Sequence, residues 1–259
     1  MTDVGDATAG ILTVASLQVK ADGQATAGQE DVVVEAPLEL MLDGEVLAVT
    51  MRTPGHDAEL TAGFLLAEGH GAPGSPPSVA ARVVRRGTLS SAACGVCGRD
   101  SIEDLLARMT PLTTETRFER AMLADVTSRL RTYQPNFART GGLHAAALVA
   151  RSGEVLIVRE DVGRHNAVDK VLGRAALDGL LPLSEHVLVV SGRTSFEIVQ
   201  KALSAGVPAL VAVSAPSSLA IELAQRFRVL LIGFARAGAF TAYAGQFRLA
   251  GMDSGVAPE

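Results

Sequence analysis

The chain has 259 residues, of which 48% are apolar and 20% charged, and its mean hydropathy is +0.28. This is long enough to bury a large core, and few aromatic residues among many small aliphatic ones favour an α/β fold. A net charge of −5 excludes the basic surface expected of a protein that binds polymeric nucleic acid. An acidic start and the lack of an apolar run of membrane length predict a cytoplasmic protein with no membrane contact.

The chain is predicted to begin with a tail and a small α+β region. Residues 1–27 are rich in Ala, Gly, Thr and Asp, and we expect them to form a flexible tail. Order is expected from residue 28 onward. Apolar runs then predict strands over residues 31–35, 38–42 and 46–51 and around Arg82. The pair Asp43-Gly44 is typical of a type I′ hairpin turn between two of these strands.

Three helices are predicted before residue 140, over residues 58–68, 101–109 and 116–133. Asp57 is the expected N-cap of the first helix, and Gly69 is expected to end it. The third helix is amphipathic, so its apolar stripe should face the core. Pro135 is expected to close this region, and Gly141-Gly142 marks the boundary to the second half.

Cys94 and Cys97 are the only cysteines of the chain, and two residues separate them. Such a pair commonly has a lowered thiol pKa, so it can carry a sulfur atom or form a transient disulfide. Gly95 and Gly98 give the backbone extra freedom, which predicts a mobile loop. Because lasting disulfides are disfavoured in the cytoplasm, the pair is interpreted as catalytic.

Other interpretations of the cysteine pair stay open. The two thiols could be unrelated buried side chains. A structural zinc site needs four ligands, and the five histidines lack the spacing of a zinc finger, so we expect no permanent protein-bound metal. A thioredoxin-like motif opens a helix directly after a strand, whereas residues 88–93 separate Cys94 from the strand near Arg82.

From residue 140 the sequence predicts a regular alternation of strands and helices. Strands over residues 143–150 and 154–159 should form a hairpin through Ser152-Gly153. The further elements are a helix over 166–180, strands over 185–190, 210–213 and 229–234, and helices over 196–204 and 219–226. This order favours parallel strands that are covered by helices and joined by right-handed crossovers.

Two adjacent strand ends carry loops that suit an anionic ligand. Residues 191–195 (Ser-Gly-Arg-Thr-Ser) and 214–218 (Ser-Ala-Pro-Ser-Ser) each lead into a predicted helix. Ligands of open α/β sheets bind at this edge, where free N–H groups and helix N-termini favour phosphate and Arg193 adds a charged fork. The alternative is that Ser195 and Ser218 only cap the helices. The predicted hydroxyl donors are those of Thr194, Ser195, Ser214 and Ser217.

The densest polar stretch covers residues 159–170, at a strand end and a helix start. Asp161, His165 and Asp169 are spaced four residues apart, so they would share one face of a helix. The alternative is a solvated capping region. The stretch matches no phosphate loop, metal motif or hydrolase motif, so the sequence does not decide whether Asp161, His165 and the earlier His144 are catalytic or structural.

Several segments together resemble the formate dehydrogenase accessory sulfurtransferase family (FdhD). The matching segments are residues 52–57 with Glu59, 63–69, 94–98, 140–144, 160–170 and 191–197. They follow the order of the family and span most of residues 30–247, and such a set is very specific. The tail and the loop over residues 71–78 are outside the resemblance.

The resemblance implies a sulfurtransferase that accepts persulfide sulfur from a cysteine desulfurase. It implies delivery of that sulfur to the molybdenum or tungsten bis(guanine dinucleotide) cofactor of formate dehydrogenase, which is bound as a substrate. Cys94 is the implied carrier, with Cys97 as a relay or resolving thiol. The implied guanine nucleotide site includes Phe240, Thr241, Ala242, Tyr243, Ala244 and Gly245. A second hypothesis is a cofactor-binding chaperone whose CxxC pair is redox-regulatory.

The resemblance also implies a homodimer and an α/β fold with a cytidine-deaminase-like three-layer core around a mixed sheet. The expected organisation is a tail over residues 1–27, an N-terminal α+β region with the mobile CxxC loop over 28–139, a nucleotide-binding core over 140–251 and a tail over 252–259. Deaminase chemistry is not expected, because Ala146 stands where a zinc deaminase would need glutamate after His144, and because the CxxC pair precedes this histidine.

Overall fold

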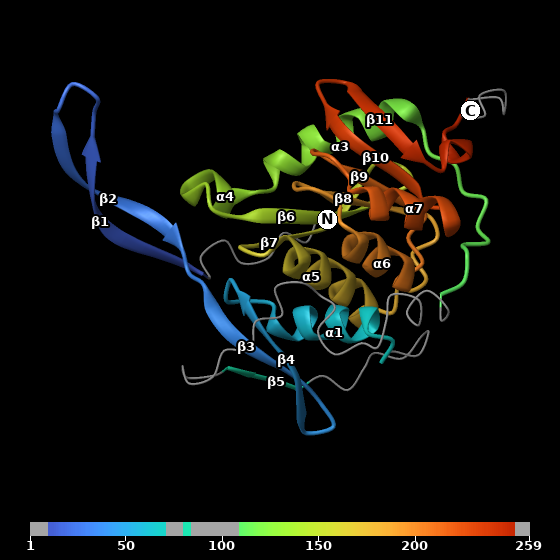
Figure 1. Ribbon diagram of the computed structural model, residues 1–259, viewed down its shortest axis with the longest axis horizontal. Coiled ribbons are helices and arrows are strands. Elements are labelled where there is room, and N and C mark those ends of the chain that lie inside the picture. Colours follow the sequence, from blue (N-terminus) through green and yellow to red (C-terminus); the bar gives the residue numbers. More distant parts are fainter. Residues whose placement is uncertain (1–9, 71–79, 84–108, 252–259) are drawn as a thin grey trace.

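The computed structural model describes residues 10–70, 80–83 and 109–251, which form a body around one large sheet and a projecting arm (Figure 1). The large sheet has six strands in the order β11-β10-β9-β8-β6-β7. Its strands are β6 (His144–Ala150), β7 (Val155–Asp161), β8 (His186–Val190), β9 (Ala209–Ala212), β10 (Leu230–Arg236) and β11 (Ala239–Ala244). Strands β8, β9 and β10 are parallel and the other pairings are antiparallel, so the predicted mixed sheet is confirmed.

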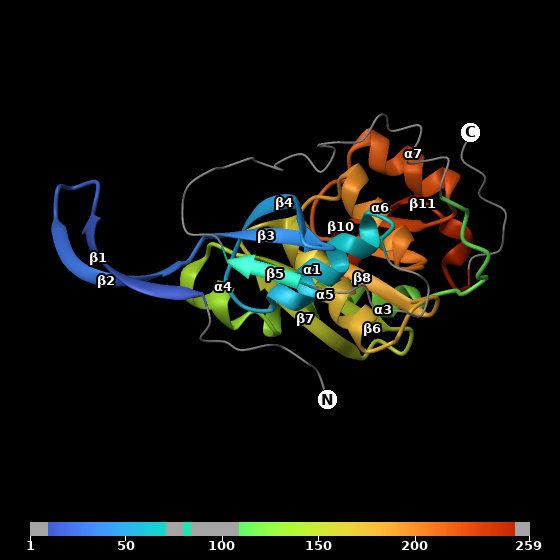
Figure 2. The ribbon, with the colours of Figure 1, turned by 90° about the horizontal axis from the view of Figure 1, so that it is seen from below.

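Helices cover both faces of this sheet (Figures 1 and 2). One face carries α5 (Arg164–Leu177), α6 (Phe196–Ser204) and α7 (Ser218–Arg226), and the other carries α3 (Arg120–Thr132). A short helix, α4 (Pro135–Thr140), leads from α3 into β6, and a 3₁₀ turn, η1 (Gln246–Arg248), follows β11. Three layers are therefore present, whereas the closer likeness to cytidine deaminases stays a prediction.

The strands of the sheet centre are apolar on both sides. In β8, Leu188 and Val190 face the cluster under α5, α6 and α7, whereas Val187 and Val189 face the cluster under α3. Successive side chains of a strand point to opposite faces, so a strand buried on both faces reads as a continuous apolar run. This explains why the predicted bounds of these strands lie close to the observed ones.

The N-terminal region adds a second, smaller sheet. Its three strands are β3 (Ala36–Leu42), β4 (Glu45–Arg52) and β5 (Ala80–Val83), in the order β4-β3-β5. Asp43 and Gly44 join β3 to β4 with positive φ angles of 50° and 88°, as a type I′ turn requires, which confirms the predicted turn. Helix α1 (Asp57–Ala67) follows and lies against α5 (Figure 1).

Helices α1 and α5 touch through their backbones at two glycines. A Cβ atom at Gly63 would lie 2.0 Å from the backbone oxygen of Asp169, and one at Gly173 would lie 1.8 Å from the backbone oxygen of Glu59. No other residue fits at such distances without moving one helix. The glycines thus set the close approach that brings the charged residues of α1 to those of α5.

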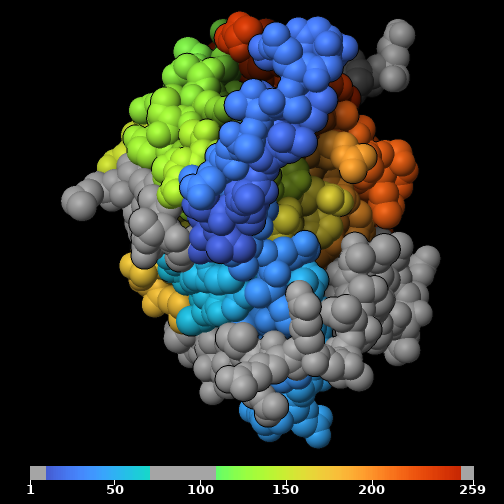
Figure 3. Space-filling model, turned by 90° about the vertical axis from the view of Figure 1, so that its left-hand side faces the viewer, coloured from blue at the N-terminus to red at the C-terminus, as the bar shows by residue number. Residues whose placement is uncertain are grey.

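The structure corrects the prediction for the start of the chain. Residues that were expected to form a tail instead build an antiparallel hairpin of β1 (Ile11–Val19) and β2 (Ala25–Val33), paired from Ile11↔Val33 to Val19↔Ala25. This hairpin is the arm that projects from the body in Figure 1 and forms a ridge across one face in Figure 3. Backbone pairing over nine residues of each strand supplies the order that the many Ala, Gly, Thr and Asp residues of this segment hid.

Helix starts were also predicted imperfectly. His56, not Asp57, occupies the N-cap of α1, with φ 60°, and Asp57 accepts hydrogen bonds of 2.8 and 2.7 Å from Arg52. The long helix begins at residue 120 rather than 116, because the fully buried Phe118 pairs with Leu249 outside the helix. Pro135 begins α4 instead of ending the region, which suits a residue whose missing N–H is not needed at a helix start.

Several predictions lie outside the described residues. These are the loop over 71–78, the mobile CxxC arm with Cys94 and Cys97, the helix over 101–109 apart from its last residue, and the tail over 252–259. In the part of the chain that is described, none of the helices combines the length and the apolar character needed to cross a membrane.

Candidate functional site

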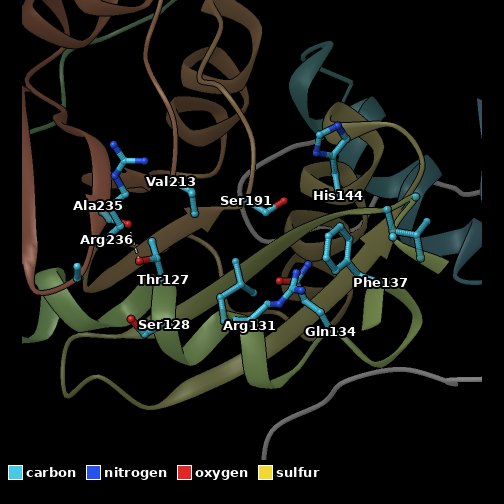
Figure 4. Close-up of a pocket in the computed structure, with 15 residues that line it drawn as sticks. Thr127, Ser128, Arg131, Gln134, Phe137, His144, Ser191, Val213, Ala235 and Arg236 are labelled. Atoms are coloured by element: carbon cyan, nitrogen blue, oxygen red, sulfur yellow. Dashed lines mark hydrogen bonds between the residues drawn. The ribbon is translucent and has the colours of Figure 1, made fainter. Parts of the chain in front are cut away.

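A cavity of about 550 Å³ lies at the edge where β8, β9 and β10 end (Figure 4). Because β6 runs antiparallel to β8, its first residue lies at the same edge. Helices α3 and α4 supply the opposite wall. The lining residues are Thr127, Ser128, Leu130, Arg131, Gln134, Phe137, Gly141, Gly142, Leu143, His144, Ser191, Val213, Ala235, Arg236 and Ala237. This is the edge at which ligands of open α/β sheets bind.

The cavity combines positive charge with an aromatic wall. Arg131 comes from α3 and Arg236 from the end of β10, and both are exposed. The Arg131 guanidinium lies 4.1 Å from the ring centroid of Phe137, a cation–π contact that holds it beside the cavity. Guanidinium groups form paired hydrogen bonds to phosphate or carboxylate, so this lining suits an anionic ligand.

His144 brings an imidazole to the cavity. Burial lowers the pKa of His144 below its ordinary value, and the positive charge of Arg164 lowers it further. The ring lies close to the backbone of Gly192, where a Cβ atom would be 3.4 Å from His144 Nδ1. A neutral imidazole has one donor and one acceptor nitrogen, so His144 can both give and take a hydrogen bond in the cavity.

The two predicted anion loops are joined to each other. The Thr194 N–H donates to the Ala215 carbonyl at 3.2 Å, and the Ser217 N–H donates to the Thr194 carbonyl at 2.9 Å. Thr194 is only 1% exposed, whereas Arg193 is exposed. Two of the N–H groups that were expected to be free for an anion are therefore used, because the loops stabilise one another.

Serine caps differ from the prediction. In α7 the N-cap is Ser217, whose hydroxyl accepts from the Ala220 N–H at 3.3 Å, and Ser218 is the first helical residue. In α6 the N-cap is Ser195, but its side chain makes no capping hydrogen bond. The Ser195 hydroxyl instead lies 3.2 Å from His165 Nε2.

The stretch from Phe240 to Gly245 reaches the cavity edge only at its start. A turn at Ala237 and Gly238 reverses the chain, so β11 runs antiparallel to β10 and Ala244 pairs with Leu231 at the far end. All six residues were expected at the nucleotide site, but the end of the stretch lies away from the cavity edge. Tyr243 is partly buried and its ring lies on Gly233, beside the apolar cluster of α5, α6 and α7.

The cavity lining includes none of the predicted nucleotide-binding residues of the two loops (Arg193, Thr194, Ser195, Ser214 and Ser217) or of residues 240–245. Ser191, the first residue of the loop over 191–195, does line it, and its hydroxyl accepts from the Ala145 N–H at 2.9 Å. The predicted loops therefore adjoin the cavity. Sequence reasoning missed the wall from α3 and α4, because nothing in an amphipathic helix marks the residues that border a ligand edge.

The polar stretch over 159–170 is buried rather than solvated. Lys170 Nζ lies 2.7 Å from Asp161 Oδ2, and the two side chains are 1% and 0% exposed. Lys170 also donates to the Thr53 carbonyl at 2.9 Å, while the Thr53 N–H donates to Asp161 at 3.2 Å. Asp161 ends β7 and so does not share a helix face with Asp169. These contacts attach β4 and α1 to β7 and α5.

A second buried pair supports the same attachment. Arg159 donates to both oxygens of Glu59, at 2.6 and 2.9 Å, and His56 Nδ1 lies 3.2 Å from Glu59 Oε2. Burial opposes ionisation of Glu59, but the hydrogen bonds from Arg159 and His56 outweigh it, so the pKa of Glu59 is lowered. Together the two ion pairs form the junction between α1 and the main sheet.

His165 and Asp169 have partners on α6. His165 Nδ1 lies 2.6 Å from Glu197 Oε2, and Lys201 Nζ lies 2.8 Å from Asp169 Oδ1. The regular spacing of Asp161, His165 and Asp169 thus leads to three different partners. The role of Glu197 was missed, since it lies far from His165 along the chain. Within the described ranges, no group of three or more His, Cys, Asp or Glu side chains could hold a metal ion.

Comparisons with known proteins place this chain in a family. The profile of the FdhD/NarQ family matches residues 74–250. The sulfur carrier protein FdhD of Streptomyces avermitilis is 44% identical, over 88% of this chain and 92% of that protein. The sulfur carrier protein FdhD of Anaeromyxobacter dehalogenans strain 2CP-C is 47% identical, over 83% and 87%.

A solved structure shares the fold. The crystal structure of a candidate formate dehydrogenase accessory protein from Desulfotalea psychrophila superposes with a TM-score of 0.76 at 24% identity, covering 93% of this chain and 99% of that chain. The family match and the two relatives agree with the resemblance found in the sequence. The chain belongs to the FdhD/NarQ family.

Proposed function

We propose that this protein is a sulfurtransferase that takes sulfur from a cysteine desulfurase and delivers it to the cofactor of formate dehydrogenase. The observation that carries the proposal is the pair Cys94 and Cys97, the only thiols of the chain, within the residues matched by the family. Relatives named sulfur carrier proteins support this role. A carrier needs a nucleophilic thiol, and a CxxC pair supplies one with a second thiol in reach.

The sulfur moves in two steps. The Cys94 thiolate attacks the outer sulfur of the donor persulfide, the donor S–S bond breaks, and the donor leaves as a thiolate. In the second step Cys97 attacks the Cys94 sulfur, which releases sulfide to the acceptor and leaves a Cys94–Cys97 disulfide. A dithiol reductant then restores both thiols, as in ordinary thiol–disulfide exchange.

The acceptor is the molybdenum bis(guanine dinucleotide) cofactor, bound here as a substrate. The cavity at the sheet edge, with Arg131 and Arg236 at its border, supports binding of an anionic dinucleotide. The adjoining loops and the start of β11 complete the proposed site. Its proposed members are Arg193, Thr194, Ser195, Ser214, Ser217, Phe240 and Thr241.

The working form is a homodimer in which the β1–β2 arm contacts a second copy. Leu12, Leu17 and Val19 are 56%, 63% and 64% exposed on this arm, which leaves apolar side chains facing solvent. Exposed apolar surface of this kind is typical of an association surface. Changing Leu17 and Val19 to serine should shift the molar mass measured by light scattering from dimer to monomer, and an unchanged mass would reject the arm as the contact.

Persulfide formation tests the carrier role directly. After incubation with an active cysteine desulfurase and cysteine, intact mass spectrometry should show one added sulfur, mapped to Cys94. Cys94→Ala should remove the adduct, whereas Cys97→Ala should keep the sulfur on Cys94 and slow its release to a dithiol. No added sulfur on either cysteine would reject a carrier role.

The chaperone hypothesis is separated by a complementation assay. The Cys94→Ala/Cys97→Ala variant should fail to support formate dehydrogenase activity while binding guanine nucleotide as the unchanged chain does. A chaperone would still support that activity, so retained activity would favour the second hypothesis. Thermal unfolding of both preparations controls for loss of folding.

Calorimetric titration tests the nucleotide site. GDP should bind more tightly than ADP, and Arg193→Ala should weaken GDP binding by about 1.5 to 3 kcal/mol, the range for a lost charge-assisted hydrogen bond. Arg226→Ala is a suitable control, because this exposed arginine lies at the end of α7 over Phe227. Equal affinities for GDP and ADP would overturn the proposed nucleotide site but would leave the proposed cysteine chemistry unaffected.

A further inference from the structure

Ser195, His165 and Glu197 form a hydrogen-bonded series that takes no part in the two proposed sulfur-transfer steps, although Ser195 is also a proposed member of the cofactor site. The Ser195 hydroxyl lies 3.2 Å from His165 Nε2, and His165 Nδ1 lies 2.6 Å from Glu197 Oε2. A hydroxyl on one imidazole nitrogen and a carboxylate on the other is the arrangement of nucleophile, base and orienting acid in serine hydrolases. The residues come from α5 and from the start of α6.

A second serine in the same molecule shows what a plain cap looks like. Ser217 precedes α7 as Ser195 precedes α6, and each follows a parallel strand. The Ser217 hydroxyl accepts from the Ala220 N–H, whereas Ser195 leaves its capping position unused and turns to His165. The contact with His165 therefore replaces the ordinary role of an N-cap serine.

Neighbouring charged groups keep Glu197 ionised, and in this form it can orient the His165 imidazole. Lys201 Nζ lies 3.6 Å from Glu197 Oε1 and 2.8 Å from Asp169 Oδ1. Burial opposes the charged form of Glu197, but the hydrogen bond with His165 and the charge of Lys201 outweigh it and lower the pKa of Glu197. Glu197 thus stays ionised, and an ionised carboxylate fixes the His165 tautomer with its proton on Nδ1.

We propose that Ser195 is an activated nucleophile for small acyl esters, with His165 as its general base and Glu197 as the residue that positions His165. The His165 and Glu197 side chains are 21% and 16% exposed, so a small reagent has access to the series. Ser195 stands at the N-terminus of α6, where first-turn N–H groups lack partners within the helix and can receive the oxygen of an attacked carbonyl.

The chemistry has two balanced steps. Ser195 Oγ attacks the ester carbon while its proton moves to His165 Nε2, and the alkoxide or phenoxide leaves with that proton as the ester C–O bond breaks. Water then attacks the acyl-serine, again giving its proton to His165. The carboxylic acid departs, and the Ser195 hydroxyl is regenerated. No oxidant, reductant or metal is needed, and neither step depends on the proposed sulfur transfer.

Covalent labelling tests the proposal. The full chain carrying Cys94→Ser and Cys97→Ser, which removes both competing thiols, is treated with a fluorophosphonate, and the adduct is mapped by peptide mass spectrometry. The adduct should be on Ser195, with one fluoride lost. In the same background His165→Gln should slow labelling by about 100-fold or more, the usual contribution of a general base. Hydrolysis of p-nitrophenyl acetate should fall with it.

Further variants separate chemistry from structure. Glu197→Gln should also slow labelling, because an amide can hold the imidazole in the wrong tautomer. Ser204→Ala is the matched control on the same helix, because the Ser204 hydroxyl donates to the Gln200 carbonyl at 3.1 Å, and it should label at the unchanged rate. Absence of an adduct on Ser195, or an adduct formed equally fast in folded His165→Gln, would overturn the proposal. Ser195 is unchanged in the protein that carries only the two cysteine substitutions. The presence or absence of an adduct on Ser195 is therefore decided there, even if the His165 and Glu197 variants fold poorly.

Discussion

Two charged regions of this protein differ in how the fold places their side chains. At the junction between α1 and the main sheet, charged groups are buried and paired, as Asp161 with Lys170 and Glu59 with Arg159. At the sheet edge, Arg131 and Arg236 are exposed beside a cavity. Burying an ion pair costs desolvation free energy, and each buried charge needs the other as its partner. An exposed arginine costs little free energy and can contact a ligand. A dense polar motif therefore does not by itself indicate a binding site.

The largest loss of stability is expected from a substitution that breaks the ion pairs of this junction. Lys170→Met leaves the Asp161 carboxylate buried without its cation, so the free energy of unfolding should fall by about 3 to 5 kcal/mol. Urea unfolding followed by circular dichroism measures this. The double variant Asp161→Asn/Lys170→Met removes both charges and should recover part of the loss. A single variant as stable as the unchanged chain would show that the junction charges do not hold α1 in place.

A smaller loss is expected from the helix contact behind those charges. Gly173→Ala puts a Cβ atom where the Glu59 backbone oxygen leaves no room, and the resulting strain should cost about 1 to 3 kcal/mol in unfolding free energy. Gly28→Ala is the matched control on the arm, where the new Cβ would lie 3.6 Å from the Ser16 hydroxyl, an ordinary contact. Equal losses in the two variants would argue against a backbone contact between α1 and α5.

A third prediction concerns pH and the cavity. The folded pKa of His144 is lowered by burial and then by Arg164, so below pH 6.5 the unfolded chain takes up a proton that the folded chain resists. Stability should therefore fall as the pH drops through 6.5 toward the folded pKa. His144→Gln should make this part of the pH dependence shallower, as measured by urea unfolding from about pH 5 to 8. An NMR titration midpoint of His144 above its ordinary value would contradict the sign.

The smallest effect on stability is expected at the cavity border. Arg236→Ala should change the free energy of unfolding by no more than about 0.5 kcal/mol, because this side chain is exposed. In the same preparation its affinity for GDP should fall, which calorimetry measures. A large stability loss with unchanged GDP binding would reverse the comparison and make the cavity border structural.

Much of the fold could be predicted, because the signals are local. The apolar runs of β8 and β10 mark strands buried on both faces, and Asp43-Gly44 marks a type I′ turn whose positive φ angles are present. Helix α6 was predicted with its observed bounds, Phe196–Ser204. The β1–β2 arm could not be found in this way, because its order comes from pairing between two strands in a segment that is rich in Ala, Gly, Thr and Asp.

The candidate site was predicted less completely. The edge at the ends of β8 and β9 follows from the alternation of strands and helices, but the wall of Thr127, Arg131 and Phe137 depends on where α3 and α4 pack. The antiparallel return of β11 carries Tyr243 and Gly245 away from that edge. A sequence gives the order of elements, and only their packing decides which of them meet at a cavity.

The sequence by itself was enough to identify the cysteine pair Cys94 and Cys97, the alternation of strands and helices in the second half of the chain, and the resemblance to a family. Tertiary structure alone decided that Asp161, His165 and Asp169, equally spaced along the chain, meet Lys170, Glu197 and Lys201. The physical reason is that local propensities act within a few residues, whereas a buried charge requires a partner that the fold brings from another element.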